Sequence, residues 1–338
     1  MSDIAQRRPM RKSILIGTTA VAAAAGLALT VLPAVADSGG SGSRDASGHA
    51  GHGSGSGSDG VAVQSGSGDA AFFAASLNGA NEVPVQGGPA VGDKDGAALE
   101  FVKVKGGTVS FAVKWRGTDK PTALHIHQGA KGVNGGIKVD FTQQLGKAEG
   151  RTLTGSVQVK DAALLNAFKA APNSFYANLH TAEFPGGAVR GQFHRVTQAF
   201  DFGRALKSFQ APVLKGRQIY ECKKGTDGKF SFQQRDVAAV LAGGIAHTFV
   251  KPNSGTPQWI APDLSAVTGA VISRTPNGDN IPELDLKATQ SGAKHGLFSR
   301  TSEILRLNTV GGVAPAGSCA EGALAAVPYQ ADYVFVRR

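Results

Sequence analysis

The sequence predicts a mainly β protein with two antiparallel β-sandwich or barrel-like domains, and three observations indicate this class. Short segments alternate apolar and polar residues between Gly, Pro, Asn or Asp, which is typical of antiparallel strands. The chain has 338 residues, and about 270 remain after an N-terminal export segment and a linker, enough for two domains. Its 41% hydrophobic and 18% charged residues can fill two cores and exclude a wholly disordered chain or a coiled coil.

Residues 1–36 are predicted to be a signal peptide that is cleaved after Ala36. A basic segment precedes an apolar run over residues 14–32, and Ala34-Val35-Ala36 offers the small residues that a signal peptidase recognises. The Arg7-Arg8 pair also approximates the twin-arginine pattern, so export by that route and by the general secretory route both stay open. The alternative is an uncleaved anchor, since the run has nearly the length of a bilayer span. We expect cleavage, a secreted protein and no stable membrane span.

Residues 37–68 are predicted to be a flexible tether. Gly and Ser make up 20 of these 32 residues, a composition that cannot bury enough apolar surface to order itself. The net charge of the whole chain is +10, and loss of the signal segment leaves +7 without a basic cluster. We therefore expect no nucleic-acid partner, whereas a basic surface can adsorb to an anionic cell wall.

The first folded domain is predicted over residues 69–198. A hairpin of two strands, 99–105 and 109–115, turns at Gly106-Gly107. Asp161 is suited to cap a short helix that runs over 162–171 and ends before Pro172. Further strands are expected over 123–128, 137–142, 152–159, 175–181 and 189–196. Strands of this number and spacing favour an antiparallel sandwich or barrel.

Two of these strands carry three histidines that could bind a metal ion. Side chains alternate along a strand, so His125 and His127 share one face while Leu124 and Ile126 share the other. If the strand with His180 is a neighbour, its imidazole completes a three-histidine cluster. Imidazoles in this number suit copper or zinc with an open position. The alternative is that these histidines only form hydrogen bonds on the outer face.

Four motifs of this domain resemble the signature of the CHRD domain, named after the repeats in chordin. The motifs are Asn81-Glu82-Val83-Pro84, His125-Ile126-His127-Gln128-Gly129, Tyr176-Ala177-Asn178-Leu179-His180-Thr181 and Phe184-Pro185-Gly186-Gly187-Ala188-Val189-Arg190-Gly191-Gln192. The resemblance implies an extracellular β domain.

The strand with His125 and His127 is also similar to the copper strand of copper/zinc superoxide dismutase. A complete dinuclear site of that kind needs six His and an Asp, but this domain has only four His, the other two being His180 and His194. At most one mononuclear ion is therefore expected. Elsewhere in the domain, Glu82 and Arg190 could form an ion pair that closes the ends of the sheet, or could recognise an anion together.

The second folded domain is predicted over residues 199–338. Strands are expected over 218–222, 230–232, 270–272, 284–288, 304–308 and 329–336, with no long helix between them. Cys222 and Cys319 are the only cysteines, and a pair in an exported chain favours a disulfide over a metal site or a catalytic thiol.

This second domain resembles the domain of unknown function 3455 over nearly all of residues 205–336. The motifs are Gly216-Arg217-Gln218-Ile219-Tyr220-Glu221-Cys222, Pro257-Gln258-Trp259, Arg306-Leu307-Asn308-Thr309-Val310-Gly311-Gly312 and Val327-Pro328-Tyr329-Gln330-Ala331-Asp332-Tyr333. His247, Trp259 and Asp263 could line a ligand pocket, in which Trp offers a stacking face and the other two polar groups. The alternative is a half-buried Trp with hydrogen bonds in nearby turns.

The sequence favours a binding protein over an enzyme, because it lacks the common catalytic motifs. The chain has no Gly-x-Ser-x-Gly elbow, His-Glu-x-x-His helix, Cys-x-x-Cys pair or Gly-Lys-Ser/Thr phosphate loop. We therefore assign no catalytic residues. The favoured hypothesis is a secreted, non-enzymatic module that binds an extracellular ligand or a cell-wall surface. The alternative is a secreted protein that binds one copper or zinc ion through His125, His127 and His180.

Overall fold

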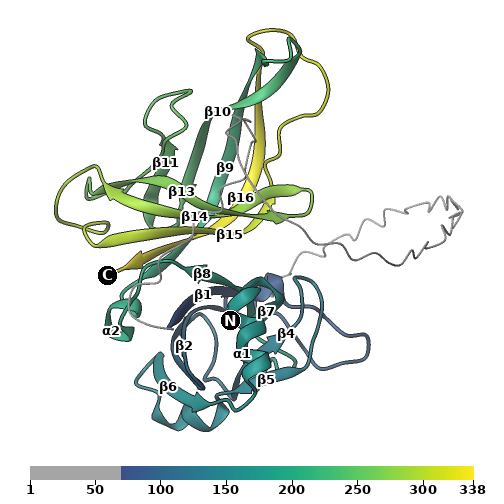
Figure 1. The fold of residues 1–338 in the computed structure, drawn as a ribbon, viewed down its shortest axis with the longest axis vertical. Helices are drawn as coiled ribbons and strands as arrows, with labels where there is room; N and C mark the ends of the chain where they lie inside the picture. The colour runs from purple at the N-terminus through teal and green to yellow at the C-terminus, as the bar shows by residue number, and fades with distance from the viewer. Residues whose placement is uncertain (1–69) are drawn as a thin grey trace, which may run out of the picture. The chain divides into compact units, whose positions relative to one another are not determined.

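The computed structural model describes residues 70–338. The predicted signal peptide and linker lie outside the described residues. Two eight-stranded antiparallel sheets make up the described chain, which confirms the predicted mainly β class. The first sheet is an open half-barrel and the second is a closed barrel (Figure 1). Among residues 70–338, no helix is long and apolar enough to cross a membrane.

The first sheet has the strand order β5-β4-β7-β8-β1-β2-β3-β6. Its strands are β1 (Ala71–Asn78), β2 (Ala97–Lys105), β3 (Thr108–Arg116), β4 (Ala123–Gln128), β5 (Ile137–Asp140), β6 (Thr152–Gln158), β7 (Phe175–His180) and β8 (Val189–Val196). Every neighbouring pair is antiparallel. The predicted strands of this domain are confirmed, within a few residues at their ends.

Strand β1 was not predicted, because its sequence does not alternate between apolar and polar residues. Seven of its eight residues are buried, so it has no polar face to mark it as a strand. It lies between β8 and β2 in the middle of the sheet. In contrast, β3 alternates as predicted, and its Val109, Phe111, Val113 and Trp115 enter the hydrophobic core.

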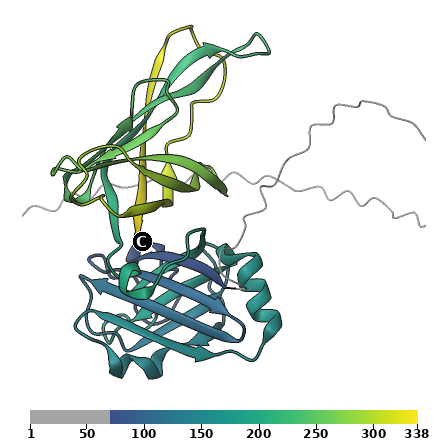
Figure 2. The same cartoon turned by 60° about the vertical axis from the view of Figure 1, so that its left-hand side comes forward.

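Helix α1 (Ala162–Ala170) packs beside this sheet (Figure 2). The side chain of Asp161 accepts a hydrogen bond from Leu164 N at 2.9 Å, which confirms the predicted N-cap. Leu165 and Phe168 fill the core from the helix. Short 3-10 helices are η1 (Gly79–Asn81), η2 (Thr142–Lys147) and η3 (Pro172–Ser174).

The second sheet closes in the order β10-β11-β12-β13-β14-β15-β16-β9. Its strands are β9 (Phe209–Lys224), β10 (Phe230–Leu241), β11 (Ile245–Phe249), β12 (Pro257–Ile260), β13 (Ala266–Asn277), β14 (Asn280–Gln290), β15 (Thr301–Gly311) and β16 (Leu324–Arg337). The helical segments are α2 (Phe202–Ala205) and η4 (Ala242–Gly244). All six predicted strands lie within these elements, whereas β11 and β12 were not predicted.

The strands of the barrel are longer than the alternating segments predicted, because bulges interrupt the alternation. The pairing of β10 with β9 shifts its register between Gln234 and Asp236 and again between Val240 and Leu241. Each shift exchanges the faces of the residues that follow, so a period-two pattern cannot be followed through it. One core of aliphatic and aromatic side chains fills much of the barrel, with Trp259 and Phe335 among its most buried members.

Candidate functional site

The three histidines of the half-barrel lie together on the face of the sheet opposite the core. β4 and β7 are antiparallel neighbours in which His125 pairs with Asn178 and Ala123 pairs with His180. Residues that pair directly point to the same face, so His180 joins His125 and His127. One ring nitrogen from each of the three residues lies within 4.8 Å of the other two.

Backbone carbonyls outside the cluster set the tautomers of two of these rings. His127 Nδ1 lies 2.9 Å from the Gly135 carbonyl oxygen, and His180 Nδ1 lies 3.1 Å from that of Pro185. Because a carbonyl oxygen can only accept, each Nδ1 carries the proton and donates it. The Nε2 atoms of both rings therefore keep a free lone pair. His127 Nε2 is buried and has no hydrogen-bond partner among the described residues.

The third ring has its Nε2 turned outward. His125 Nε2 lies 3.4 Å from Asp140 Oδ1 and 3.3 Å from Thr142 Oγ1. Its other nitrogen, Nδ1, lies 3.3 Å from His180 Nε2. When His125 donates from Nε2 to the Asp140 carboxylate, the lone pairs of His125 Nδ1 and His180 Nε2 face each other. That arrangement is repulsive unless a proton or a cation lies between them.

Burial keeps all three imidazoles in their neutral form. Desolvation and, to a smaller extent, the neighbouring His180 lower the pKa of His125 to about 4, although Asp140 opposes the shift. Desolvation likewise lowers the pKa of His127 and of His180. Neutral imidazole is the form that binds a metal ion, so protons compete little for these nitrogens at neutral pH.

A stack of three side chains supports His127 from behind. The Tyr176 ring lies parallel to the His127 ring, with centroids 4.8 Å apart, and the Arg190 guanidinium lies 3.5 Å from the Tyr176 centroid. Arg190 Nη2 also donates to the Ala130 and Val133 carbonyl oxygens at 3.0 and 2.9 Å. Arg190 thus holds the segment that leads to the Gly135 carbonyl, the acceptor of the His127 proton.

Glu82 and Arg190, which could form an ion pair or recognise an anion together, each contact other groups in the structure. Among the ion pairs of residues 70–338, none joins these two side chains. The Arg190 guanidinium lies over the Tyr176 ring and donates hydrogen bonds to carbonyl oxygens. Glu82 accepts a hydrogen bond of 3.4 Å from Asn178 Nδ2. Burial raises the pKa of Glu82 to about 7, although Arg190 and Asn178 each lower it.

The barrel brings together two of the three residues predicted to line a ligand pocket. His247 and Trp259 are direct partners on β11 and β12, and their rings stack 4.4 Å apart. Both line one cavity inside the barrel. Asp263 does not line that cavity, because its carboxylate accepts hydrogen bonds from Ser265 and from Leu297 N and so shapes a turn.

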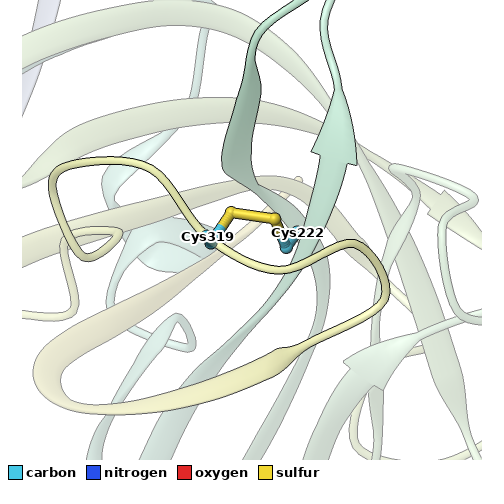
Figure 3. The surroundings of a disulfide bond; sticks show 2 residues. All are labelled: Cys222 and Cys319. Atoms are coloured by element: carbon cyan, nitrogen blue, oxygen red, sulfur yellow. A yellow bond between two sulfur atoms is a disulfide. The ribbon is translucent and has the colours of Figure 1, made fainter.

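The predicted disulfide between Cys222 and Cys319 is present (Figure 3). Cys222 lies on β9, and Cys319 lies in the loop that precedes β16. The bond joins residues 97 positions apart in the sequence. It therefore closes a loop that contains most of the barrel.

The groups that orient the three histidines were not predicted from the sequence. The Gly135 and Pro185 carbonyls belong to backbone that carries no side-chain signal for this role. Asp140 pairs with His125 across β4 and β5, and only the strand register shows this. The available signal was the Phe184-Pro185-Gly186-Gly187 motif, which turns the chain back toward the histidines.

Two family models match the chain. The CHRD domain model matches residues 73–193, and the model of the protein of unknown function DUF3455 matches residues 243–337. No curated protein and no solved structure matches the chain significantly. The second match begins after β10, later than the resemblance suggested, so β9 and β10 complete the barrel outside it. A CHRD domain and a disulfide are consistent with an extracellular protein, and the two domains are compatible with a non-enzymatic binding module. The chain thus joins a CHRD domain to a DUF3455 domain.

Proposed function

We propose that this chain is an exported binding protein whose CHRD domain holds one copper or zinc ion on His125, His127 and His180. One observation carries the proposal: His127 and His180 each direct a proton outward to a carbonyl and a lone pair inward. Metal-ligating histidines in proteins usually have such an outer acceptor, which fixes the ring and its tautomer. His125 follows the same arrangement with Asp140 as its outer acceptor.

The distances are close to those that a bound ion requires. A tetrahedral ion with metal–nitrogen bonds of about 2.0–2.1 Å separates its ligand nitrogens by about 3.3 Å. His125 Nδ1 and His180 Nε2 already have this separation, at 3.3 Å. The nitrogens of the cluster lie at most 4.8 Å apart, so the most distant pair must approach by up to about 1.5 Å to bind one tetrahedral ion.

The donor set selects the class of metal. Three neutral imidazoles suit copper and zinc, whereas magnesium and calcium prefer oxygen donors. For a given nitrogen site, Cu²⁺ generally binds more tightly than Zn²⁺. Three protein ligands leave at least one position of the ion open, as in metal sites that accept a small molecule.

Elemental mass spectrometry of the protein secreted into the culture medium tests this proposal. We expect about one equivalent of copper or zinc in the wild type, and loss of this metal in His180→Ala and in the double variant His125→Ala/His127→Ala. The matched control is His295→Ala, because His295 is exposed and lies outside the cluster. Circular dichroism checks that each variant folds. Copper binding by His180→Ala equal to that of the wild type would refute the proposal.

A groove on the barrel supports a second candidate function, binding to an anionic cell-wall polymer. The groove follows β9 and β10, and its lining includes Lys215, Arg217 and Arg235 beside apolar side chains such as Val240. Lys215 and Arg217 are exposed, so they can contact a large polyanion from solvent.

Sedimentation of the protein with purified cell walls, in the presence of a chelator, tests this second function. We expect binding by the wild type and weaker binding by Lys215→Glu/Arg217→Glu. Charge reversal at two exposed lysines of the CHRD domain, Lys105→Glu/Lys147→Glu, is the control. Failure of the wild type to sediment with the walls contradicts the polymer-binding function and leaves the metal site untouched.

A further inference from the structure

The interior of the DUF3455 barrel contains a cavity of about 90 Å³ that neither of the proposed functions uses. The polar residues that line it include Gln218, His247, Arg274, Arg306 and Tyr333, together with the Trp259 indole. Trp259 and Gln218 are each only 1% exposed, whereas Arg274 is exposed at the rim. The cavity therefore runs from an open rim to a buried aromatic wall.

Two buried N–H groups in this lining have no partner. Trp259 Nε1 and Gln218 Nε2 are buried and make no hydrogen bond among the described residues. Buried donors are almost always paired in folded proteins, so each unpaired one needs an explanation. An acceptor on a bound molecule would satisfy them.

The imidazole in the lining already uses both of its nitrogens inside the protein. His247 Nδ1 lies 2.9 Å from the Gln258 carbonyl, so it donates there, and His247 Nε2 lies 3.1 Å from the Tyr333 hydroxyl. Burial lowers the pKa of His247 to about 3, so this ring is neutral and accepts from Tyr333. The groups left for a ligand are mainly donors.

The charge of the lining is positive. It contains Arg274 and Arg306 but no Asp or Glu. Arg306 donates through Nε and Nη2 to the Pro282 carbonyl, which fixes the plane of its guanidinium group. Asp236 is the carboxylate that acts on His247, and it accepts bonds from Val237 N, Thr248 Oγ1 and Phe249 N. A guanidinium beside unpaired N–H donors is suited to a carboxylate.

The volume and the flat wall limit the size of the ligand. A cavity of about 90 Å³ is smaller than the roughly 150 Å³ that accommodates a benzene molecule. The rings of His247 and Trp259 stack with their planes within 5° of parallel, so the outer face of the stack is a flat surface. A planar molecule of about four to six heavy atoms fits such a space.

We propose that the DUF3455 barrel binds a small organic carboxylate, with its oxygens toward Arg306, Arg274 and the free N–H groups of Trp259 and Gln218, and its body against the stacked His247 and Trp259 rings. The site is independent of the metal cluster, since it lies in the other domain and shares no residue with it.

Tryptophan fluorescence of the full chain tests this site. Trp115 and Trp259 are the only tryptophans, so Trp115→Phe leaves an emission that reports on the cavity alone. Acetate, lactate and pyruvate are titrated at constant ionic strength, with acetamide as the neutral analogue of acetate. We expect a saturable change with at least one carboxylate and at least tenfold weaker binding of acetamide. Ligand-observed NMR on the wild type repeats the comparison without the Trp115 substitution.

Substitutions at the rim identify the charged group. We expect Arg274→Gln to weaken carboxylate binding at least tenfold, whereas Arg300→Gln, an exposed arginine outside the lining, leaves it unchanged. Absence of saturable binding for all three carboxylates in both assays overturns the proposal, as does acetamide binding as tightly as acetate. Equal affinity in Arg274→Gln and the wild type also overturns it. A chelator in every titration keeps these outcomes separate from those of the metal site.

Discussion

Replacing Glu100 by Gln is expected to stabilise the CHRD domain, and increasingly so as the pH rises. Glu100 lies on β2 between Ala75 of β1 and Val113 of β3, both of which belong to the hydrophobic core. Its side chain is fully buried, and neither carboxyl oxygen has a hydrogen-bond partner among the described residues. Such burial disfavours the charged form and raises the pKa of Glu100 from 4.5 to about 8.

The size of the effect follows from this shift. Between pH 4.5 and 8 the folded chain holds a proton on Glu100 that the unfolded chain has lost. The free energy of unfolding therefore falls with rising pH, by about 1.4 kcal/mol per pH unit. The contribution of Glu100 is fully present below pH 4.5 and is lost as the pH rises to 8, a total of about 5 kcal/mol. Gln cannot ionise, so we expect Glu100→Gln to match the wild type near pH 4.5 and to exceed it by about 3 kcal/mol at pH 7.

Urea unfolding at pH 5, 6, 7 and 8 measures this difference. Trp115 lies in the core of the CHRD domain, so its emission in a Trp259→Phe background follows this domain alone. Glu183→Gln is the control, because Glu183 is exposed in the same domain. The reasoning is refuted if the free energies of Glu100→Gln and the wild type differ by the same amount at every pH.

Three further variants have defined outcomes. Loss of the disulfide through Cys222→Ser/Cys319→Ser should lower the free energy of unfolding by about 4–5 kcal/mol, because the closed loop is long; urea midpoints unchanged from the wild type would contradict this. Arg190→Gln should raise the Kd for copper about 10–100-fold at unchanged stoichiometry, because Arg190 positions the groups that support the ligand His127. Titration calorimetry measures this Kd, and an unaltered value would contradict the positioning role of Arg190. Gly191→Ala should lower the melting temperature by circular dichroism, because a Cβ there would lie 2.3 Å from the Ser76 carbonyl oxygen; an unchanged melting temperature would contradict the close strand approach.

Local patterns sufficed to predict many elements of both domains. The alternation in β3 and the Asp161 cap of α1 are properties of a few consecutive residues, so they can be recognised without the fold. β1 could not be recognised in this way, because a strand buried on both faces has no alternation. Only residues 230–232 of the bulged strand β10 were predicted, because its alternating pattern changes face along its length.

The candidate sites also combine features that a few residues predict with features that depend on strand pairing. Strand parity placed His125 and His127 on one face, and the count of two cysteines indicated the disulfide. Strand pairing alone decided that β7 is the neighbour of β4, which brings His180 to within 3.3 Å of His125.

The orientation of the imidazoles and the cavity of the barrel depend on contacts between distant segments. The acceptors for His127 and His180 are backbone carbonyls, and any residue type can supply a carbonyl. Asp263 carries a polar group that could line a pocket, but its carboxylate accepts hydrogen bonds from Ser265 Oγ and Leu297 N within a turn. The sequence by itself determines the chemistry of each residue and the short-range periodicity. The contacts between distant groups are determined only by the tertiary structure, because they form when the sheets close and the buried polar groups pair.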